Sequence, residues 1–249
     1  MIKYFNPSIV YHDMKTVELI LSPALYSYRL TQENHTTVVI DILRATTSIC
    51  AAFQAGAESV VPLNSLDPLP HYRELGYTLA AERNGEKVQN AQCGNSPTEY
   101  LTMNLKGQRL AYSTTNGTVG ILLAAKDSKR VLIGCFSNLS ALVEVLQHDN
   151  NNLVILCSGW KNGVALEDSL FAGNLIEQLH DYQPINDAAN MAKTLYTTVQ
   201  NDLYGYCQRG THIHRLQRLN YDRDIKFAFQ KDCCPVVPEL IDGTLYKII

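Results

Sequence analysis

The chain has 249 residues, of which 46% are hydrophobic and 18% charged, as is typical of a globular protein with a sizeable core. Its 21 basic and 24 acidic residues give a net charge of −3, so it lacks the basic surplus of a nucleic-acid-binding protein. No apolar run reaches the roughly 18 residues of a membrane span, and the first ten residues show no secretory signal, so we expect a cytoplasmic protein without membrane or nucleic-acid partners.

Apolar strand patterns and helical patterns alternate along the first 100 residues. The predicted strands are 16–21, 37–43, 59–63 and 77–81. The first of them ends at Ser22 and Pro23, which favours an antiparallel or edge strand. A helical pattern over 45–56 is closed by Gly56. Ser96, followed by a proline and then an acidic residue three positions later, predicts the start of another helix.

From residue 109 the alternation becomes regular. Strands are predicted at 109–114, 131–135 and 153–157, and the helices that follow them at 117–126, 138–147 and 167–180. Further helices are predicted at 187–202 and 211–220, and a last strand at 244–248. This order predicts an α/β fold in which a mostly parallel sheet is flanked by helices.

Four of these strands run directly into clusters of hydroxyl, amide and glycine residues. The clusters lie at 41–48, 113–118, 134–138 and 157–159. Free backbone N–H groups at the start of a helix hold anions without a large net positive charge. Because ligands of α/β proteins bind at the carboxyl edge of the sheet, the pattern predicts a small, doubly anionic ligand.

Asp41 is a carboxylate in an otherwise apolar strand, and Arg44 follows three residues later. A buried carboxylate is costly unless it is paired or binds a cation. One interpretation is an internal Asp41–Arg44 ion pair. The other places Asp41 on a divalent metal and Arg44 on the anionic group of a substrate. Thr46 and Thr47 then offer hydroxyl groups beside the free N–H groups of the following helix.

The segment Thr114, Thr115, Asn116, Gly117 and Thr118 is the second candidate phosphate site. A turn with a helix N-cap needs only one of these polar side chains. The others are available for a ligand, and a glycine lets the backbone approach that ligand closely. The Walker spacing is absent, so the segment does not indicate a nucleotide.

Two acidic clusters and the cysteines have alternative interpretations. Glu82 and Arg83 form either a solvated pair on a surface turn or part of the site. Glu167 and Asp168 suit the start of a helix, but next to an anion site they would also suit Mg²⁺.

The 7 cysteines lack zinc-site spacing, and Cys157 lacks the arginine of a thiol-phosphatase loop, so we expect buried thiols.

Seven motifs occur in one order along the chain. They are 39–47, 82–85, 94–100, 114–118, 137–138, 157–159, and 167–168 with 172–173. From about residue 36 to residue 238 they closely resemble the 2-phosphosulfolactate phosphatase family. The resemblance implies one unit over 1–249, with two interleaved α/β subdomains of about 1–110 and 111–249, the site between them, and a strand order peculiar to the family.

The resemblance also implies an activity: Mg²⁺-dependent hydrolysis of (R)-2-phospho-3-sulfolactate to 3-sulfolactate and phosphate, in coenzyme M biosynthesis. The expected catalytic residues are Asp41, Arg44, Glu167 and Asp168, and the expected metal ligands are Asp41, Glu167 and Asp168. The expected substrate-binding residues are Thr46, Thr47, Glu82, Arg83, Asn95, Ser96, Thr114, Thr115, Asn116, Gly117 and Thr118.

Several alternatives stay open. Residues 158–161 depart from the family pattern, so the organic part of the substrate is undecided, and another small 2-phospho acid is an alternative. A non-catalytic protein that binds an anionic metabolite is a second alternative, and a homodimer is compatible with the sequence. Attack by water or directly by a carboxylate is undecided. His212, His214, Arg215 and Arg218 either lie on the surface or close over the site.

Overall fold

The computed structural model describes residues 14–29 and 34–249. Its strands are β1 (Lys15–Ile20), β2 (His35–Ile40), β3 (Ser59–Leu63), β4 (Thr78–Arg83), β5 (Glu86–Lys87), β6 (Arg109–Ser113), β7 (Arg130–Gly134), β8 (Asn152–Cys157), β9 (Tyr182–Pro184), β10 (Pro238–Ile241) and β11 (Thr244–Lys247). Its α-helices are α1 (Ala45–Gln54), α2 (Leu69–Glu74), α3 (Pro97–Tyr100), α4 (Gly117–Ala124), α5 (Leu139–Gln147), α6 (Leu166–Gln178), α7 (Asp187–Val199), α8 (Leu203–Cys207), α9 (Thr211–Arg218) and α10 (Asp222–Ala228). Two 3₁₀ helices are η1 (Pro23–Tyr28) and η2 (Phe136–Asn138).

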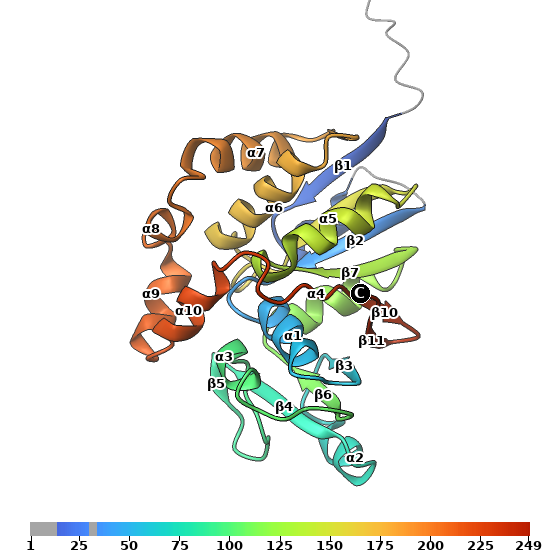
Figure 1. Ribbon diagram of the computed structural model, residues 1–249, viewed down its shortest axis with the longest axis vertical. Coiled ribbons are helices and arrows are strands. Elements are labelled where there is room, and N and C mark those ends of the chain that lie inside the picture. Colours follow the sequence, from blue (N-terminus) through green and yellow to red (C-terminus); the bar gives the residue numbers. More distant parts are fainter. Residues whose placement is uncertain (1–13, 30–33) are drawn as a thin grey trace, which may run out of the picture.

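These strands form one sheet in the order β5-β4-β6-β3-β11-β10-β7-β2-β8-β1-β9, with helices packed against it (Figure 1). The strands β4, β6 and β3 are parallel to one another, and so are β7, β2, β8, β1 and β9. The hairpin of β10 and β11 joins the two groups, with antiparallel pairing to β7 and β3. The predicted α/β fold with a mostly parallel sheet is therefore confirmed.

Strands that precede residue 110 belong to both groups. β1 and β2 lie in the larger group, whereas β3, β4 and β6 form the smaller one. The division of the chain into subdomains near residue 110 stays a prediction. Within the sheet, the two parallel groups are joined by the C-terminal hairpin and not by a strand from the middle of the chain.

The prediction for the first strand was wrong. β1 is parallel to β8 on one side and to β9 on the other, so it is neither antiparallel nor an edge strand. Pro23 misled the prediction because it lies beyond the strand, at the first position of η1, where Ser22 caps the helix. A proline there removes no hydrogen bond from the sheet.

The centre of the sheet is buried on both faces. Every residue of β2 is buried, and every residue of α1 except Gln54 is buried as well. Two predicted helix boundaries are confirmed: Gly56 follows α1 with a φ of +97°, and Oγ of Ser96 accepts a hydrogen bond from the Glu99 amide at 3.2 Å. The predicted helix 187–202 corresponds to α7, which ends at Val199, whereas α8, α10 and β10 were not predicted.

None of the helices in the described ranges has the length and apolar character needed to cross a membrane. The expectation that the first ten residues form no secretory signal concerns positions outside those ranges.

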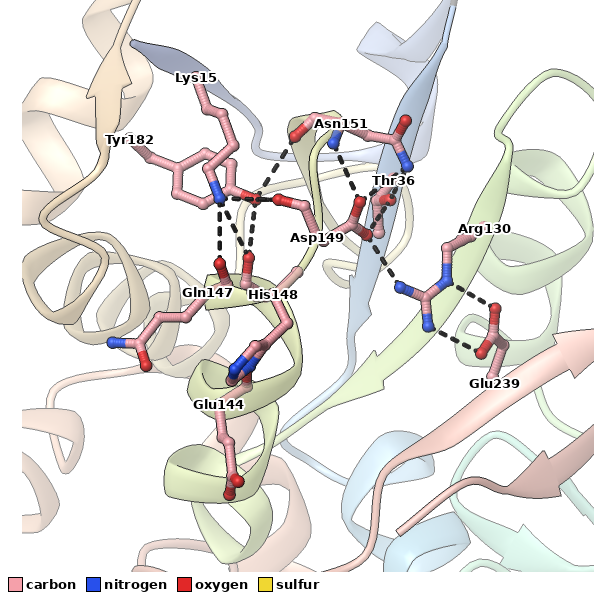
Figure 2. A network of polar contacts seen from close by, with 11 residues as sticks. Lys15, Thr36, Arg130, Glu144, Gln147, His148, Asp149, Asn151, Tyr182 and Glu239 are labelled. Carbon is pink, nitrogen blue, oxygen red and sulfur yellow. Dashed lines mark hydrogen bonds and ion pairs between the residues drawn. The ribbon is translucent and has the colours of Figure 1, made fainter. Parts of the chain in front are cut away.

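A polar network at the amino ends of β2 and β7 holds the C-terminal hairpin to the sheet (Figure 2). Asp149 accepts hydrogen bonds from Oγ1 of Thr36 at 2.6 Å and from Nη1 of Arg130 at 3.0 Å. Arg130 also donates to both carboxylate oxygens of Glu239, at 2.8 and 2.9 Å. Although burial opposes the shift, the hydrogen bonds from Thr36 and Asn151 and the charge of Arg130 lower the pKa of Asp149.

We expect Glu239→Gln to destabilise the protein by about 1–2 kcal/mol, because one of two charge-assisted hydrogen bonds to a partly buried arginine is lost. Urea unfolding at neutral pH would measure the change. Asp242→Asn is the matched control, since it removes one negative charge from an exposed turn of the same hairpin. Equal urea midpoints of unfolding for the two variants would contradict this role of Glu239.

Candidate functional site

A small pocket lies where both strand groups end. Its volume is about 20 Å³, which is room for about one water molecule. Its walls come from the segments after β2, β6 and β8, from β4 and the turn after it, and from α9. The lining residues are Asp41, Leu43, Arg44, Glu82, Gly85, Asn95, Asn116, Trp160, His212, Arg215 and Leu216.

Asp41 is the carboxylate at the centre of this site. The predicted strand 37–43 ends at Ile40, so Asp41 lies directly beyond the strand and only 6% of it is exposed. Burial raises the pKa of Asp41 to about 6, although the charge of His212 opposes the shift. The charges of Glu82 and Glu167 act in the same direction as burial. A cation among these carboxylates would therefore be bound favourably.

Glu82 and Glu167 are buried, and each already has polar partners. Oε1 of Glu82 accepts a hydrogen bond from the Thr115 amide at 2.7 Å, and Oε2 accepts one from the Gly85 amide at 2.6 Å. Oε1 of Glu167 lies 2.8 Å from Nδ1 of His212. Because a carboxylate only accepts, Nδ1 of His212 carries the proton, and Nε2 is the nitrogen left for other partners.

The carboxylate of Asp168 accepts hydrogen bonds from the loops after β2 and β8. Its Oδ1 accepts from the Ile42 amide at 2.9 Å, and its Oδ2 accepts from the Gly159 amide at 3.0 Å. Burial raises the pKa of Asp168, and the charges of Glu167 and Asp41 raise it further. Both oxygens hold backbone groups, so this geometry favours Asp41 and Glu167 over Asp168 as metal ligands.

Arg44 does not pair with Asp41, so the interpretation as an internal Asp41–Arg44 ion pair was wrong. Its Nη1 donates to Oδ2 of Asp224 at 2.7 Å, and its Nη2 donates to the Gly85 carbonyl at 2.8 Å. The guanidinium also lies over the ring of Tyr221, 3.7 Å from its centroid. Arg44 lines the pocket, but its buried partner Asp224 on α10 neutralises its charge.

The hydroxyl groups of Thr46 and Thr47 support the backbone next to Asp41. Oγ1 of Thr46 donates to the Asp41 carbonyl at 2.9 Å and accepts from the Asp41 amide at 3.0 Å. Oγ1 of Thr47 donates to the Ile42 carbonyl at 2.9 Å. Both threonines are buried, and neither lines the pocket. Their contacts fix the turn that presents Asp41, while their predicted role in phosphate binding stays untested.

The segment 114–118 divides into two parts. Thr114 and Thr118 bond to each other, because each hydroxyl accepts a hydrogen bond from the other residue's amide, at 3.1 and 3.2 Å. Thr115 contacts Glu82 through its amide. Asn116 lines the pocket, and its side chain makes no capping bond to α4. Gly117 lies beside Asp41, so the structure brings the two main candidate segments together.

The remaining predicted site residues are placed differently. Arg83 donates to its neighbour's carbonyl and to Oγ of Ser113 at 2.9 Å, and it does not line the pocket. Asn95 lines the pocket and accepts a hydrogen bond from the Tyr112 hydroxyl at 2.5 Å. Ser96 donates to Asp224, the partner of Arg44.

Three pocket residues that the sequence left undecided come from α9 and from the loop after β8. His212 and Arg215 on α9 both pack on Trp160: the imidazole is stacked at 5.0 Å between ring centroids, and the guanidinium carbon lies 4.1 Å from the ring centroid. His214 and Arg218 face a separate surface hollow. The sequence did contain a signal for this pair: His212 and Arg215 are three residues apart, and residues three apart lie on the same face of a helix.

Helix N-termini stabilise the buried acids. α1, α4 and α6 begin at Ala45, Gly117 and Leu166, and the first two are in direct contact. Asp41 lies before α1, and Glu167 and Asp168 lie in the first turn of α6. The positive end of a helix dipole favours a negative charge at such positions. The helix N-termini therefore partly offset the cost of burying negative charge at these positions.

Comparisons with known proteins agree on one family. The family described as 2-phosphosulpholactate phosphatase matches residues 21–243. A protein of Caldanaerobacter subterraneus subsp. tengcongensis named probable 2-phosphosulfolactate phosphatase is 34% identical over 213 residues, which are 83% of this chain and 88% of that protein. Proteins with the same name from Prochlorococcus marinus and Thermotoga maritima are 38% and 32% identical, over 82% and 85% of this chain and 88% and 91% of their own lengths.

Gly117 allows α4 to approach Asp41, and we expect Gly117→Ala to disrupt this contact. An added Cβ would lie 2.3 Å from Cβ of Ala45 and 2.8 Å from Oδ2 of Asp41. The backbone would shift, at a cost of about 1–3 kcal/mol in unfolding free energy. Displaced site groups would lower the rate of catalysed hydrolysis about 10- to 100-fold.

Thermal unfolding together with an activity assay would measure both effects. Gly94→Ala is the control, because its nearest atom is Cβ of the exposed Lys87 at 3.2 Å. An alanine variant at 117 with wild-type stability and rate would show that the close approach is not required.

Proposed function

The chain belongs to the 2-phosphosulpholactate phosphatase family, and we propose that it is a Mg²⁺-dependent phosphatase that hydrolyses (R)-2-phospho-3-sulfolactate to 3-sulfolactate and phosphate. A role in coenzyme M biosynthesis and a cytoplasmic location are part of this proposal. The family assignment supports the reaction class, a phosphoric monoester hydrolase. A homodimer stays a prediction.

The observation that carries the proposal is the meeting of acidic and basic side chains in one pocket. Asp41 and Glu82 are buried and line this pocket together with Arg44 and Arg215, and the buried Glu167 is near enough to Asp41 for its charge to raise the pKa of that aspartate. Carboxylates alone would repel a phosphate dianion, and arginines alone would not explain three buried acids. A bound cation would neutralise the acids and would allow the phosphate to approach them.

The donor set fits Mg²⁺, which prefers carboxylate, amide and water oxygens. No group of three or more His, Cys, Asp or Glu side chains in the described ranges is arranged to surround a metal ion. Mg²⁺ commonly binds through one or two carboxylates and takes its other ligands from water and substrate phosphate. Asp41 and Glu167 would hold it, and it would supply neutralisation of the charge on the phosphoryl oxygens.

The pair of His212 and Glu167 is suited to proton transfer. Glu167 holds Nδ1 of the imidazole, which fixes the ring so that Nε2 can exchange a proton with the reacting groups. In the proposed reaction a water molecule attacks phosphorus opposite the leaving alkoxide. Asn116 and the N-terminus of α4 donate hydrogen bonds to the phosphoryl oxygens as negative charge develops.

We expect the purified protein to release phosphate from phosphosulfolactate when Mg²⁺ is present, and EDTA to stop the reaction reversibly. Phosphate release over time, with and without re-added Mg²⁺, measures this. Phospholactate and phosphoglycolate as parallel substrates would separate the proposed substrate from other small 2-phospho acids. Ligand-induced stabilisation without any turnover would instead indicate a binding protein.

Asp41→Asn should abolish turnover and stabilise the protein when divalent cations are absent. Burial raises the pKa of Asp41 from 3.8 to about 6, so the folded state binds this proton more tightly than the unfolded state does. The stabilisation that comes from the protonated form of Asp41 is complete below about pH 4 and is lost as the pH rises through 6. Because asparagine is neutral at every pH, the variant should regain up to about 3 kcal/mol of unfolding free energy at pH 7.5.

Thermal unfolding in EDTA at pH 4.5 and pH 7.5 would test this, because the advantage of the variant should grow with pH. Asp168→Asn is a useful comparison, since its two backbone partners require two acceptor oxygens and the amide supplies one. If Asp41→Asn is less stable than wild type at pH 7.5, the ionised Asp41 carboxylate does not destabilise the folded protein.

A further inference from the structure

The pocket holds two arginines, and only one of them has its charge available for a ligand. Arg44 is 2% exposed and donates to Asp224 and to a backbone carbonyl. Arg83, which the sequence suggested as the second anion-binding arginine, contacts Ser113 outside the pocket. Neither of these two side chains can turn to a second acidic group without leaving its present partners.

Arg215 is in a different situation. In residues 14–29 and 34–249 no carboxylate forms an ion pair with it, and its only hydrogen bond runs from Nη2 to the carbonyl of Asn84. An added Cβ on Gly85 would lie 3.0 and 3.2 Å from the two terminal nitrogens, so the guanidinium rests directly on this turn. Burial lowers the pKa of Arg215, the charges of Glu82 and Glu86 oppose this shift, and the charges of Arg44 and Arg218 add to it.

The aromatic ring of Trp160 packs against this guanidinium. The guanidinium carbon lies 4.1 Å from the ring centroid, which is the geometry of a cation–π contact. Trp160 belongs to the stretch 158–161 that departs from the family pattern. Arg215 lines the pocket, so a ligand bound there lies within reach of its guanidinium.

We propose that Arg215 binds one of the two acidic groups of the substrate other than the phosphate, its carboxylate or its sulfonate, and that it thereby selects phosphomonoesters which carry a second anion. This inference rests on the proposed phosphatase function. A sulfonate or a carboxylate offers two or three oxygens in the geometry that a guanidinium recognises with paired hydrogen bonds. The phosphate would then lie at the other side of the pocket, near Asp41 and the start of α4.

The position of Arg215 on α9 also explains why the pocket is small. A three-carbon phosphorylated acid does not fit in about 20 Å³, so the side chains of α9 and Trp160 must move when it enters. The second anion of the substrate would then form the contact that holds α9 closed. A phosphomonoester without this anion lacks the contact and should bind more weakly.

The test compares Arg215→Gln with wild type on three substrates: phosphosulfolactate, phospholactate, which keeps only the carboxylate, and glycerol 2-phosphate, which has no second anion. For phosphosulfolactate, kcat/KM should fall about 10- to 100-fold, mainly through KM. For glycerol 2-phosphate it should not change. The effect on phospholactate shows whether the carboxylate or the sulfonate is the group bound.

Arg218→Gln is the matched control, because it removes the same charge from the same helix on its outer face. Arg215→Lys should give an intermediate loss, since an ammonium group cannot form the paired bonds of a guanidinium. Equal losses on all three substrates, or equal losses in the two glutamine variants, would overturn the inference.

A binding measurement separates this inference from the proposed function. 3-Sulfolactate should raise the melting temperature of wild type but not of Arg215→Gln, whereas inorganic phosphate with Mg²⁺ should stabilise both. Stabilisation that depends on Arg215 without any turnover would defeat only the phosphatase proposal. Turnover that does not depend on Arg215 would defeat only this inference, and absence of both turnover and stabilisation would defeat both.

Discussion

The mutual repulsion of buried carboxylates is the constraint on which the rest of this site depends. Burial raises the pKa of Asp41, and the charges of the buried Glu82 and Glu167 raise it further. Backbone amides hold Glu82, an imidazole holds Glu167, and three helix N-termini lie close by. These partners reduce the repulsion without removing it, so the ligand-free pocket keeps a surplus of negative charge that a cation would neutralise.

This arrangement needs two parts of the sheet to be held at a fixed distance. Asp41 follows β2 in the larger strand group, whereas Glu82 belongs to β4 in the smaller one. The hairpin of β10 and β11 lies between the groups (Figure 1). At the amino end of β7, the bonds from Arg130 to Glu239 keep this hairpin in place. The last strands of the chain therefore set the spacing of acids that come from its first third.

The C-terminal helices complete the site from outside the sheet. α10 supplies Asp224, which accepts from Arg44, Ser96 and Thr98 and so connects α10 with the segments before α1 and α3. α9 supplies His212 and Arg215, which pack on Trp160 over the pocket. His212 joins α9 to Glu167 on α6, and Arg215 joins α9 to the turn after β4, a geometry suited to closing over a small ligand.

The α/β class, most helices and strands, and the choice of Asp41 and segment 114–118 as candidate site residues could be predicted from the sequence, because periodicity, caps and an acid beside an apolar strand are local signals. Tertiary structure alone decided which groups meet. Arg44 turns to Asp224, Thr46 and Thr47 bond to the backbone, and Arg215 takes the position expected of Arg83. β1 lies inside the sheet because pairing depends on distant strands. Local sequence fixes what a residue can bond, whereas the packing of remote segments fixes which partner lies within reach.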